Sequence, residues 1–163
     1  MGLDMYLRKR TYLDGSNVEV VVKTKGYLTD AKIGDTFKFN KAGSISQLVG
    51  YWRKANHIHN WFVENVQEGV DNCSEYYVSR DSMRELLDVC NEVLNKCRIE
   101  NDNFVNQDVA EDLLPRCMGC FFGSDRYDED YLIDIEQTVM ILNDALKNDD
   151  SKLHSDFYYS SSW

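Results

Sequence analysis

The sequence contains a single proline in 163 residues and no low-complexity run. Disordered segments are usually rich in proline and in charged or small polar residues, so this composition argues against a long linker or tail. Long apolar runs are also missing: the longest, such as residues 18–22, are interrupted, here by Glu19, whereas a transmembrane helix needs about 20 apolar residues. Residues 1–4 include Asp4 and lead into no apolar segment of the signal-peptide type. We therefore predict a cytoplasmic protein that does not bind a membrane.

Cysteine occurs in an odd number, five, which favours reduced thiols over a disulfide framework. Cys90 and Cys97 are seven residues apart in a predicted helix, and we expect both to face the core. Cys117 and Cys120 form one CxxC motif. A zinc site would need a second CxxC or a spaced histidine pair, and a redox motif would favour a helix N-terminus after a strand. The sequence offers neither, so we predict no metal site and no cofactor.

Basic residues are outnumbered by acidic ones, 18 to 28, and are unevenly distributed, and the net charge is −10. Residues 1–60 contain ten Lys/Arg and five Asp/Glu, a charge of +5, whereas residues 61–163 contain eight Lys/Arg and 23 Asp/Glu, a charge of −15. Proteins that bind extended nucleic acids normally present a broad basic surface, so we predict no such partner. An acidic protein can still contain one small basic cleft, which suits a compact anionic ligand.

The pattern of hydrophobic and turn residues predicts an α+β fold in one compact domain, residues 1–163, with a small, mostly antiparallel sheet and about three long helices. Hydrophobic residues make up 43% of the chain, enough for a sizeable core. Strands are predicted at residues 3–12, 18–24, 36–39, 75–78 and 156–163. Helices are predicted from Ser44 or Ser46 to before Gly69, and at residues 81–97, 109–114 and 128–147.

Local signals specify parts of this fold more closely. Residues 14–17 are typical of a hairpin turn between the first two strands. Ser79 or Asp81 could cap the helix at 81–97, and the acidic residues at 128–130 match the N-terminus of the last helix. In the last strand, Phe157 and Tyr159 should face the core, while Tyr158 and the serines face the other way and could line a pocket.

The segment from Tyr51 to Val63 combines aromatic, basic, amide and imidazole side chains in a predicted helix. Helical spacing places Tyr51, Ala55, Ile58 and Phe62 on a core-facing stripe and the polar residues on the opposite side. A polar face can simply be solvated. His, Asn and Trp are poorer helix formers than Glu, Lys and Gln, however, so their use suggests a binding role.

Six segments of the chain carry a family resemblance: MGLDMYL (1–7), GYWRKAN (50–56), HNWF (59–62), EYYVS (75–79), FFGS (121–124) and the end FYYSSSW (157–163). Together they resemble a family of small proteins encoded by bacteriophages and prophages, over nearly the whole chain. Members are sometimes labelled as sugar-phosphate kinases. This chain has no glycine-rich phosphate loop followed by Lys-Ser/Thr, and it is too short for a two-domain kinase.

Small phage proteins with an aromatic and basic pocket are similar to known inhibitors of bacterial immune signalling. By this analogy, we expect the protein to bind and sequester a nucleotide messenger, a cyclic dinucleotide or an ADP-ribose derivative, in the cytoplasm of the infected bacterium. Tryptophans would stack on a purine, basic side chains would hold phosphates, and amides and an imidazole would read polar edges. The predicted ligand-binding residues are Trp52, Arg53, Lys54, Asn56, His57, Asn60 and Trp61, with Tyr77 and Arg80 in second place.

Two other function classes remain open. An enzyme that cleaves such a messenger would use His57 or His59 as acid or base, with Arg53 or Tyr51 assisting, because imidazole titrates near neutral pH. In a helix, residues two apart point in nearly opposite directions, so the two histidines could not share one substrate atom. Alternatively, the acidic half could bind a protein by imitating DNA. A homo-oligomer is compatible with each of these functions.

Overall fold

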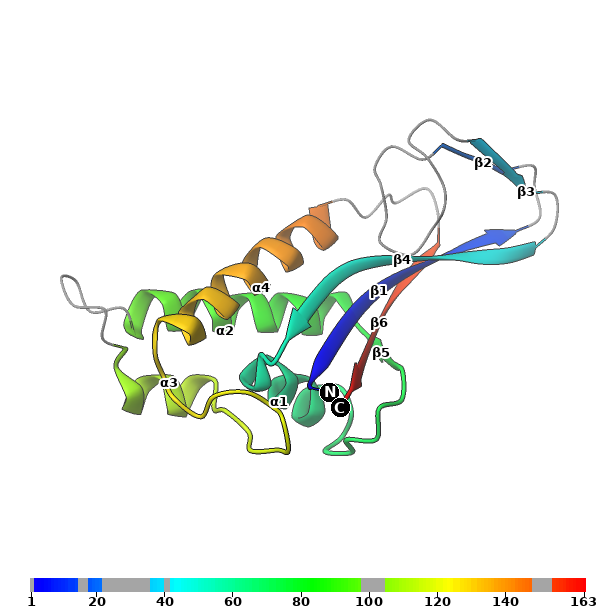
Figure 1. Ribbon diagram of the computed structural model, residues 1–163. Helices are drawn as coiled ribbons and strands as arrows, with labels where there is room; N and C mark the ends of the chain where they lie inside the picture. The colour runs from blue at the N-terminus through cyan, green and yellow to red at the C-terminus, as the bar shows by residue number, and fades with distance from the viewer. Residues whose placement is uncertain (1, 15–17, 22–35, 40–41, 98–104, 148–153) are drawn as a thin grey trace.

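The computed structural model describes residues 2–14, 18–21, 36–39, 42–97, 105–147 and 154–163. These residues form an α+β fold, as predicted, with a four-stranded antiparallel sheet, a two-stranded sheet and four helices (Figure 1). The strands are β1 (Asp4–Asp14), β2 (Val18–Val21), β3 (Thr36–Phe39), β4 (Ala42–Arg53), β5 (Tyr76–Val78) and β6 (Ser155–Ser162). The helices are α1 (Asn56–Asn65), α2 (Arg80–Cys97), α3 (Gln107–Leu113) and α4 (Glu129–Lys147).

The larger sheet has the strand order β4-β1-β6-β5, with every neighbouring pair antiparallel. Asp4 of β1 pairs with Ser162 of β6, so the two ends of the chain lie side by side (Figure 1). The long strands β1 and β4 pair along their whole length, with one register shift between Leu7 and Arg8 of β1. No helix among the described residues is long and apolar enough to cross a membrane.

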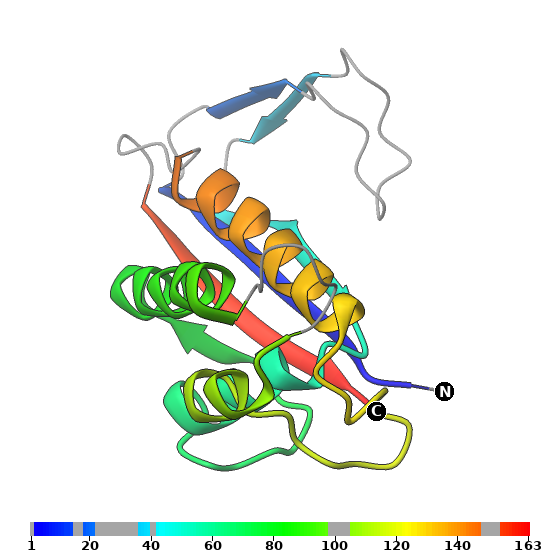
Figure 2. The ribbon, with the colours of Figure 1, turned by 90° about the vertical axis from the view of Figure 1, so that its left-hand side faces the viewer.

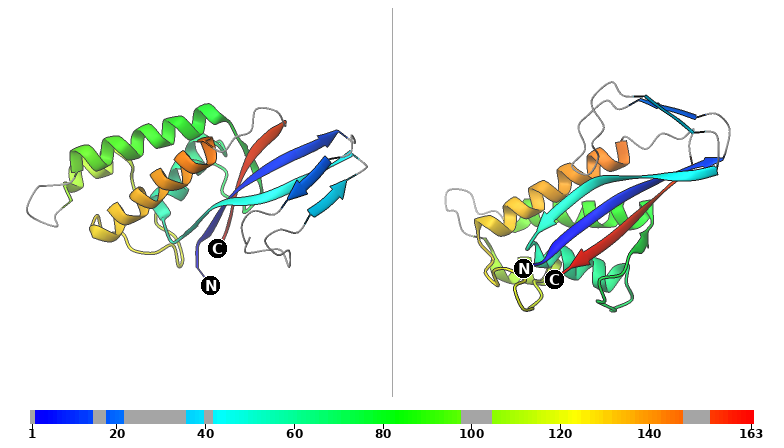
Figure 3. Two further views of the ribbon diagram at one scale, coloured as in Figure 1. Left: turned by 90° about the horizontal axis from the view of Figure 1, so that it is seen from above. Right: turned by 45° about the vertical axis from the view of Figure 1, so that its right-hand side comes forward.

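The helices lie on one side of the four-stranded sheet. Figure 2 shows α2 and α4 running side by side over it, and the right-hand view of Figure 3 shows β4, β1 and β6 with no helix in front of them. On the covered side, alternate residues of the central strands are buried, including Met5, Leu7, Phe157 and Tyr159. The ring of Tyr159 stacks on Phe62 of α1 with ring centroids 3.9 Å apart. The sheet is thus packed on one face and open on the other, the usual arrangement of a small antiparallel sheet.

Most helix predictions are confirmed to within two residues. Helix α2 begins at Arg80, and the hydroxyl of Ser79 accepts a hydrogen bond from the Ser82 amide, as expected of a capping residue. At the start of α4, the carboxylate of Asp128 accepts a hydrogen bond from the Tyr131 amide. Cys90 and Cys97 are buried, as predicted. Of the about three long helices expected, α2 and α4 are long, with 18 and 19 residues, whereas α1 and α3 have 10 and seven.

The helix predicted from Ser44 or Ser46 is wrong in its first half. Residues 42–53 form the edge strand β4, and α1 begins only at Asn56, after a turn in which Lys54 has a φ of 62°. The 11-residue strand β1 has a partner of matching length in β4. Within β4, Gly50 and Trp52 face inward while Tyr51 and Arg53 are exposed. This two-residue period is that of a strand, and the helical spacing beginning at Tyr51 runs across the turn.

The predicted hairpin between the first two strands is also wrong. Strand β1 pairs with β4 and β6, whereas β2 pairs with β3 in a separate two-stranded sheet. The turn at residues 15–17 and the predicted strand residues 22–24 lie outside the described residues. Local turn propensity did not determine the pairing here. Strand β1 pairs with β4 and β6, although β2 is nearer to it in the sequence. The final strand, β6, is confirmed, with Phe157 and Tyr159 buried and Tyr158 facing outward. The prediction that the serines face outward with Tyr158 is wrong for Ser161, which alternation places on the buried side.

Candidate functional site

The two predicted stacking residues lie in the core. Trp52 points inward from β4 and is 1% exposed, and its Nε1–H donates a hydrogen bond to Thr138 Oγ1 over 2.9 Å. Trp61 is also buried, and its ring meets Phe62 edge to face. An indole that is packed in this way presents no free face to a planar ligand. The geometry therefore gives both tryptophans a structural role.

Two of the predicted polar ligands, Asn56 and His57, are buried at the start of α1. Asn56 donates to the Ser124 carbonyl and accepts from Arg116, over 2.9 and 3.1 Å. His57 is 0% exposed, and its ring lies 4.5 Å from that of Tyr131. Neither ring nitrogen of His57 has a hydrogen-bond partner among the described residues. Burial, together with the nearby Arg116, lowers the pKa of His57 well below its usual value. The imidazole is therefore a neutral core group.

His59 belongs to a chain of hydrogen bonds that ties the end of the protein to α1. Its Nδ1 is 2.8 Å from the Tyr159 hydroxyl, and its Nε2 is 3.1 Å from Asp71 Oδ2. The other oxygen of Asp71 accepts a hydrogen bond from the Trp163 indole over 3.1 Å. The imidazole is 1% exposed, and burial lowers its pKa. An aspartate, a histidine and a hydroxyl in line resemble a catalytic relay, but this histidine has no exposed nitrogen with which to reach a substrate.

The remaining predicted residues are spread over the molecule. Asn60 donates to the Pro115 carbonyl, and Arg80 donates to the carbonyl and hydroxyl of Ser155. Lys54 is exposed in the turn before α1. Arg53 and Tyr77 are exposed on the uncovered side of the sheet, on β4 and β5. Of the nine predicted ligand-binding residues, the structure thus brings only these last two onto one surface formed by several strands.

The CxxC segment closes the N-terminal end of α1. The thiol of Cys117 donates to the Asn56 carbonyl over 3.2 Å, and burial raises its pKa to about 11. A reactive cysteine needs a lowered thiol pKa, so this environment does not favour redox chemistry. Arg116 lies beside the motif, with its guanidinium 5.1 Å over the Tyr131 ring. It connects α1, α4 and residues 115–124, a structural role that the sequence alone did not indicate.

A different set of side chains gathers on the uncovered side of the sheet. In an antiparallel pair, directly opposite residues point to the same side, so the strand register identifies this set. We call this surface the open face. It comprises Asp4, Tyr6, Arg8, Arg10 and Tyr12 of β1, Ser44, Ser46, Leu48, Tyr51 and Arg53 of β4, Asp156, Tyr158, Ser160 and Ser162 of β6, and Tyr77 of β5.

The tyrosines of the open face form two groups. Tyr6 and Tyr51 are cross-strand partners with ring centroids 5.6 Å apart. Tyr158 and Tyr77 are also partners, and their rings meet edge to face at 6.1 Å. The exposed fractions of Tyr51 and Tyr77 are 39% and 54%, so each group presents an accessible aromatic ring. Hydrogen bonds to Asp4 and Tyr12 raise the pKa of Tyr51 and Tyr158, respectively, which keeps both hydroxyls neutral.

Arginines lie among these rings. The guanidinium of Arg8 is 5.4 Å from the Tyr6 ring centroid, and that of Arg10 is 4.3 Å from the Tyr158 centroid. Arg10 also forms an ion pair with Glu75 over 2.6 Å. Within the described ranges, neither Arg8 nor Arg53 has an ion-pair partner. The open face therefore combines accessible aromatic rings with two guanidinium groups that form no ion pair among the described residues.

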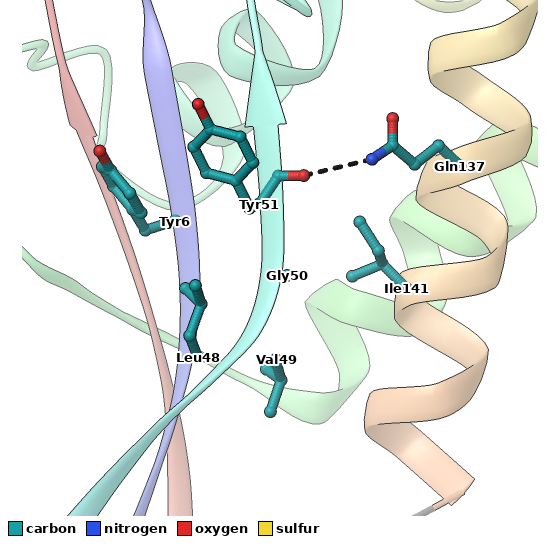
Figure 4. A pocket seen from close by; sticks show the side chains of 7 residues that line it. All are labelled: Tyr6, Leu48, Val49, Gly50, Tyr51, Gln137 and Ile141. Atoms are coloured by element: carbon teal, nitrogen blue, oxygen red, sulfur yellow. Dashed lines mark hydrogen bonds between the residues drawn. The ribbon is translucent and has the colours of Figure 1, made fainter. Parts of the chain in front are cut away.

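A hollow of about 530 Å³ lies beside the first tyrosine group, at the edge of the sheet (Figure 4). Tyr6, Leu48, Val49, Gly50 and Tyr51 line it from the sheet, and Gln137 and Ile141 line it from α4. A Cβ on Gly50 would come within 2.6 Å of Ile141 Cγ2, so this position needs glycine for the close approach of β4 and α4. The volume falls within the range of small-molecule sites.

The strand pattern of β1 was the sequence signal for this surface. Alternation across residues 4–12 separates Met5 and Leu7 from Tyr6, Arg8 and Arg10. The partner strands could not be identified from local pattern, because the sequence of β4 matches a helical period and β6 is some 150 residues distant. Only the pairing brings the tyrosines from four strands together.

The chain matches no protein-family model, and no significant match is found among curated proteins or solved structures. Within the described part of the chain, no three His, Cys, Asp or Glu side chains are grouped so that they could hold a metal ion. The open face is therefore the candidate site on geometric grounds.

Proposed function

We propose that this protein binds and sequesters a small anionic nucleotide on the open face of its sheet. The observation that carries the proposal is the position of Arg8, which lies over Tyr6 at 5.4 Å and has no ion-pair partner among the described residues. A guanidinium beside accessible aromatic rings offers a phosphate its two-pronged hydrogen bonds and a base its stacking surface.

The chemistry of the surface supports a nucleotide over other anions. Tyrosine has a high propensity for strands, so its presence alone would need no ligand. The rings of Tyr51 and Tyr77, however, are accessible on either side of the arginines, and base stacking on such rings is worth roughly 1–3 kcal/mol per base. The hollow beside Tyr6 and Tyr51 has apolar walls, and a base could enter it. A simple anion such as sulfate would use the arginines alone.

The burial of its polar side chains argues against α1 as the binding surface. Asn56 and His57 are buried, and the side-chain NH2 and carbonyl oxygen of Asn56 are already hydrogen-bonded to Ser124 and Arg116. Cleavage of the nucleotide also gains no support, because His59 is buried between Tyr159 and Asp71. Sequestration without chemistry requires only affinity, which the open face can provide.

The resemblance to phage-encoded proteins suggests the biological setting. A phage protein that removes a nucleotide immune messenger would act in the cytoplasm of the infected bacterium. Its net charge of −10 would disfavour long nucleic acids, which are abundant there, through long-range repulsion. Arg8 and Arg53 would still attract a compact anion at short range. The proposed role is therefore that of a selective sink for a small nucleotide.

The test is capture by the purified full-length protein. The protein is incubated with cyclic di-AMP, cyclic di-GMP and ADP-ribose, freed of unbound nucleotide and heat-denatured, and the released compound is identified by mass spectrometry. We expect recovery of an intact nucleotide from the wild type. Recovery should fall sharply for the double variant Arg8→Ala/Arg53→Ala. Arg84→Ala is the matched control, because Arg84 is an exposed arginine on α2, paired with Asp81.

The other outcomes identify the alternatives. Recovery of a cleaved nucleotide would make the protein an enzyme and would return attention to His57 and His59. Equal capture by the wild type and the double variant would place the site elsewhere. Failure to capture any of the three nucleotides would contradict the proposal and would favour a protein partner for the acidic half of the chain.

A further inference from the structure

The open face contains two aromatic groups, and a mononucleotide has only one base. The first group is Tyr6 with Tyr51, and the second is Tyr158 with Tyr77. Within each group the tyrosines are cross-strand partners, one pair formed by β1 and β4 and the other by β6 and β5. A ligand with a single base could stack on one group only and would leave the other exposed to water.

Arg8 lies between the two groups. Tyr6 is two residues before it on β1 and points to the same side, and Tyr158 is its direct partner on β6. Strands are spaced by about 4.8 Å and rise by about 3.4 Å per residue, so the backbones at Tyr6 and Tyr158 are roughly 8 Å apart. One phosphodiester link in an extended conformation can join bases at such a separation.

The neighbouring arginine, Arg10, is less available to a phosphate. It lies over Tyr158, and Glu75 neutralises it and raises the pKa of the guanidinium. A base can, however, stack on a guanidinium plane as well as on an aromatic ring. The layer of Arg10 on Tyr158 would then extend the second aromatic group. Arg8 remains as the guanidinium that is central to both groups.

We infer that the ligand is a dinucleotide, with one base on each aromatic group and the linking phosphate on Arg8. The inference rests on the proposed function and narrows it to ligands with two bases, which excludes ADP-ribose. Linear and cyclic dinucleotides both have two bases joined through phosphate. Their measured affinities show which of the two the protein prefers.

Calorimetric titration of the full-length protein with defined probes tests the inference. The probes are AMP, adenosine 3′,5′-bisphosphate, the linear dinucleotide ApA, the trinucleotide ApApA and cyclic di-AMP, together with their guanine counterparts. The bisphosphate has one base and extra phosphate charge, so it controls for charge. We expect the better dinucleotide, linear or cyclic, to bind at least about tenfold more tightly than the bisphosphate, given the worth of a second stacked base.

Two variants locate the effect. Arg8→Gln should weaken dinucleotide binding by about tenfold or more, because the linking phosphate loses its charged partner, while the advantage of the dinucleotide over AMP, which comes from the second base, should remain. Tyr77→Phe should keep that advantage and Tyr77→Ala should reduce it, since only the second removes the ring. Arg84→Ala should leave all affinities unchanged. Melting temperatures and circular dichroism spectra confirm that each variant is folded.

The outcomes distinguish failure of the dinucleotide inference from failure of the proposed nucleotide-binding function. If AMP or the bisphosphate binds as tightly as the dinucleotides, the inference is wrong while the proposed nucleotide-binding function stands. A further tenfold gain from ApA to ApApA would overturn the inference in favour of single-stranded nucleic acid. If no probe binds, the proposed function is wrong, and the inference is lost with it.

Discussion

The two faces of the four-stranded sheet use polar side chains in opposite ways. On the covered side, the α1 residues His59 and Asn56 are buried and tie the helix to its neighbours by hydrogen bonds, and His57 is buried against an aromatic ring. On the open face, Tyr51 is exposed and donates its hydroxyl hydrogen bond to Asp4, and Arg8 is half-buried over the Tyr6 ring. Polar and aromatic side chains that could bind a ligand therefore have a structural role on one side of the sheet and are accessible to a ligand on the other. What decides between the two roles is burial.

The largest expected effect is a loss of stability caused by a substitution on the covered face. Trp52→Ala should lower the free energy of unfolding by about 3–5 kcal/mol, because it removes a buried indole and leaves the Thr138 hydroxyl without its donor. Tyr51→Ala, one residue earlier in β4 and on the open face, is the matched comparison and should cost about 1 kcal/mol or less. Urea unfolding monitored by circular dichroism measures both. Equal losses for the two variants would contradict the assignment of the faces.

The next effect concerns the open face and affects binding instead of stability. Arg8→Ala should weaken the affinity for the captured nucleotide by about 1.5–3 kcal/mol, the range for a hydrogen bond to a charged group. Its melting temperature should remain within the error of the wild type, because Arg8 has no ion pair among the described residues. Calorimetric titration and a thermal melt give the two numbers. A large drop in melting temperature with unchanged affinity would make Arg8 structural.

A pH titration distinguishes the buried imidazole from an exposed one. The pKa of His57 is lowered in the folded protein, whereas in the unfolded chain it should be about 6.5. As pH falls below about 6.5, the unfolded chain therefore binds a proton that the native state does not, and stability falls by up to about 1.4 kcal/mol per pH unit. Burial also lowers the pKa of His59, which adds to this trend, and raises that of Asp134 to about 6, which opposes it.

Comparison with His57→Phe isolates the contribution of His57 from these others. The aromatic ring can still pack on Tyr131, and the proton is gone. The difference in unfolding free energy between wild type and variant should move in favour of the variant as pH falls from 7 to 5. Urea unfolding at several pH values measures this. A difference that is independent of pH would show that His57 is not a buried neutral group.

The smallest expected effect sharpens the contrast among the arginines. Glu75→Gln should change stability by about 1 kcal/mol or less, since the ion pair with Arg10 lies at the surface. The freed Arg10 adds an unneutralised guanidinium to the open face, so nucleotide affinity should rise a few-fold, about 0.3–1 kcal/mol. Titration at low salt is the most sensitive measurement. Unchanged affinity would mean that the ligand does not reach the second aromatic group.

Parts of the fold with strong local signals were predictable. Helices α2 and α4 have clear apolar stripes and capping residues, and the alternation in β6 placed Phe157 and Tyr159 in the core. The segment that became β4 was not, because Tyr51, Ala55 and Ile58 match a helical period by chance across the turn at Lys54. Long-range pairing with β1 decided its conformation, and such pairing is not encoded in a local window.

The candidate site also depends on long-range strand pairing, which the sequence did not reveal. Arg53 and Tyr77 were identified from their chemistry, and both lie on the open face. The burial of Trp52 and His57 could not be read from the sequence, since aromatic and imidazole groups serve in cores and in sites alike. Tyr6 and Arg8 were visible only as alternating strand residues, whereas Tyr158 was predicted to face away from the core and to be able to line a pocket. Their significance comes from the register that aligns β1 with β6.

The most direct test of this account follows the backbone amide signals of the isotope-labelled protein in nuclear magnetic resonance spectra while ApA or cyclic di-AMP is added. The central claim is that the ligand binds the open face of the sheet and not α1. The account predicts that the largest shifts occur at Tyr6, Arg8, Tyr51 and Tyr158, with α1 nearly unchanged. Shifts concentrated on α1 and residues 115–124, with the sheet signals unmoved, would contradict it.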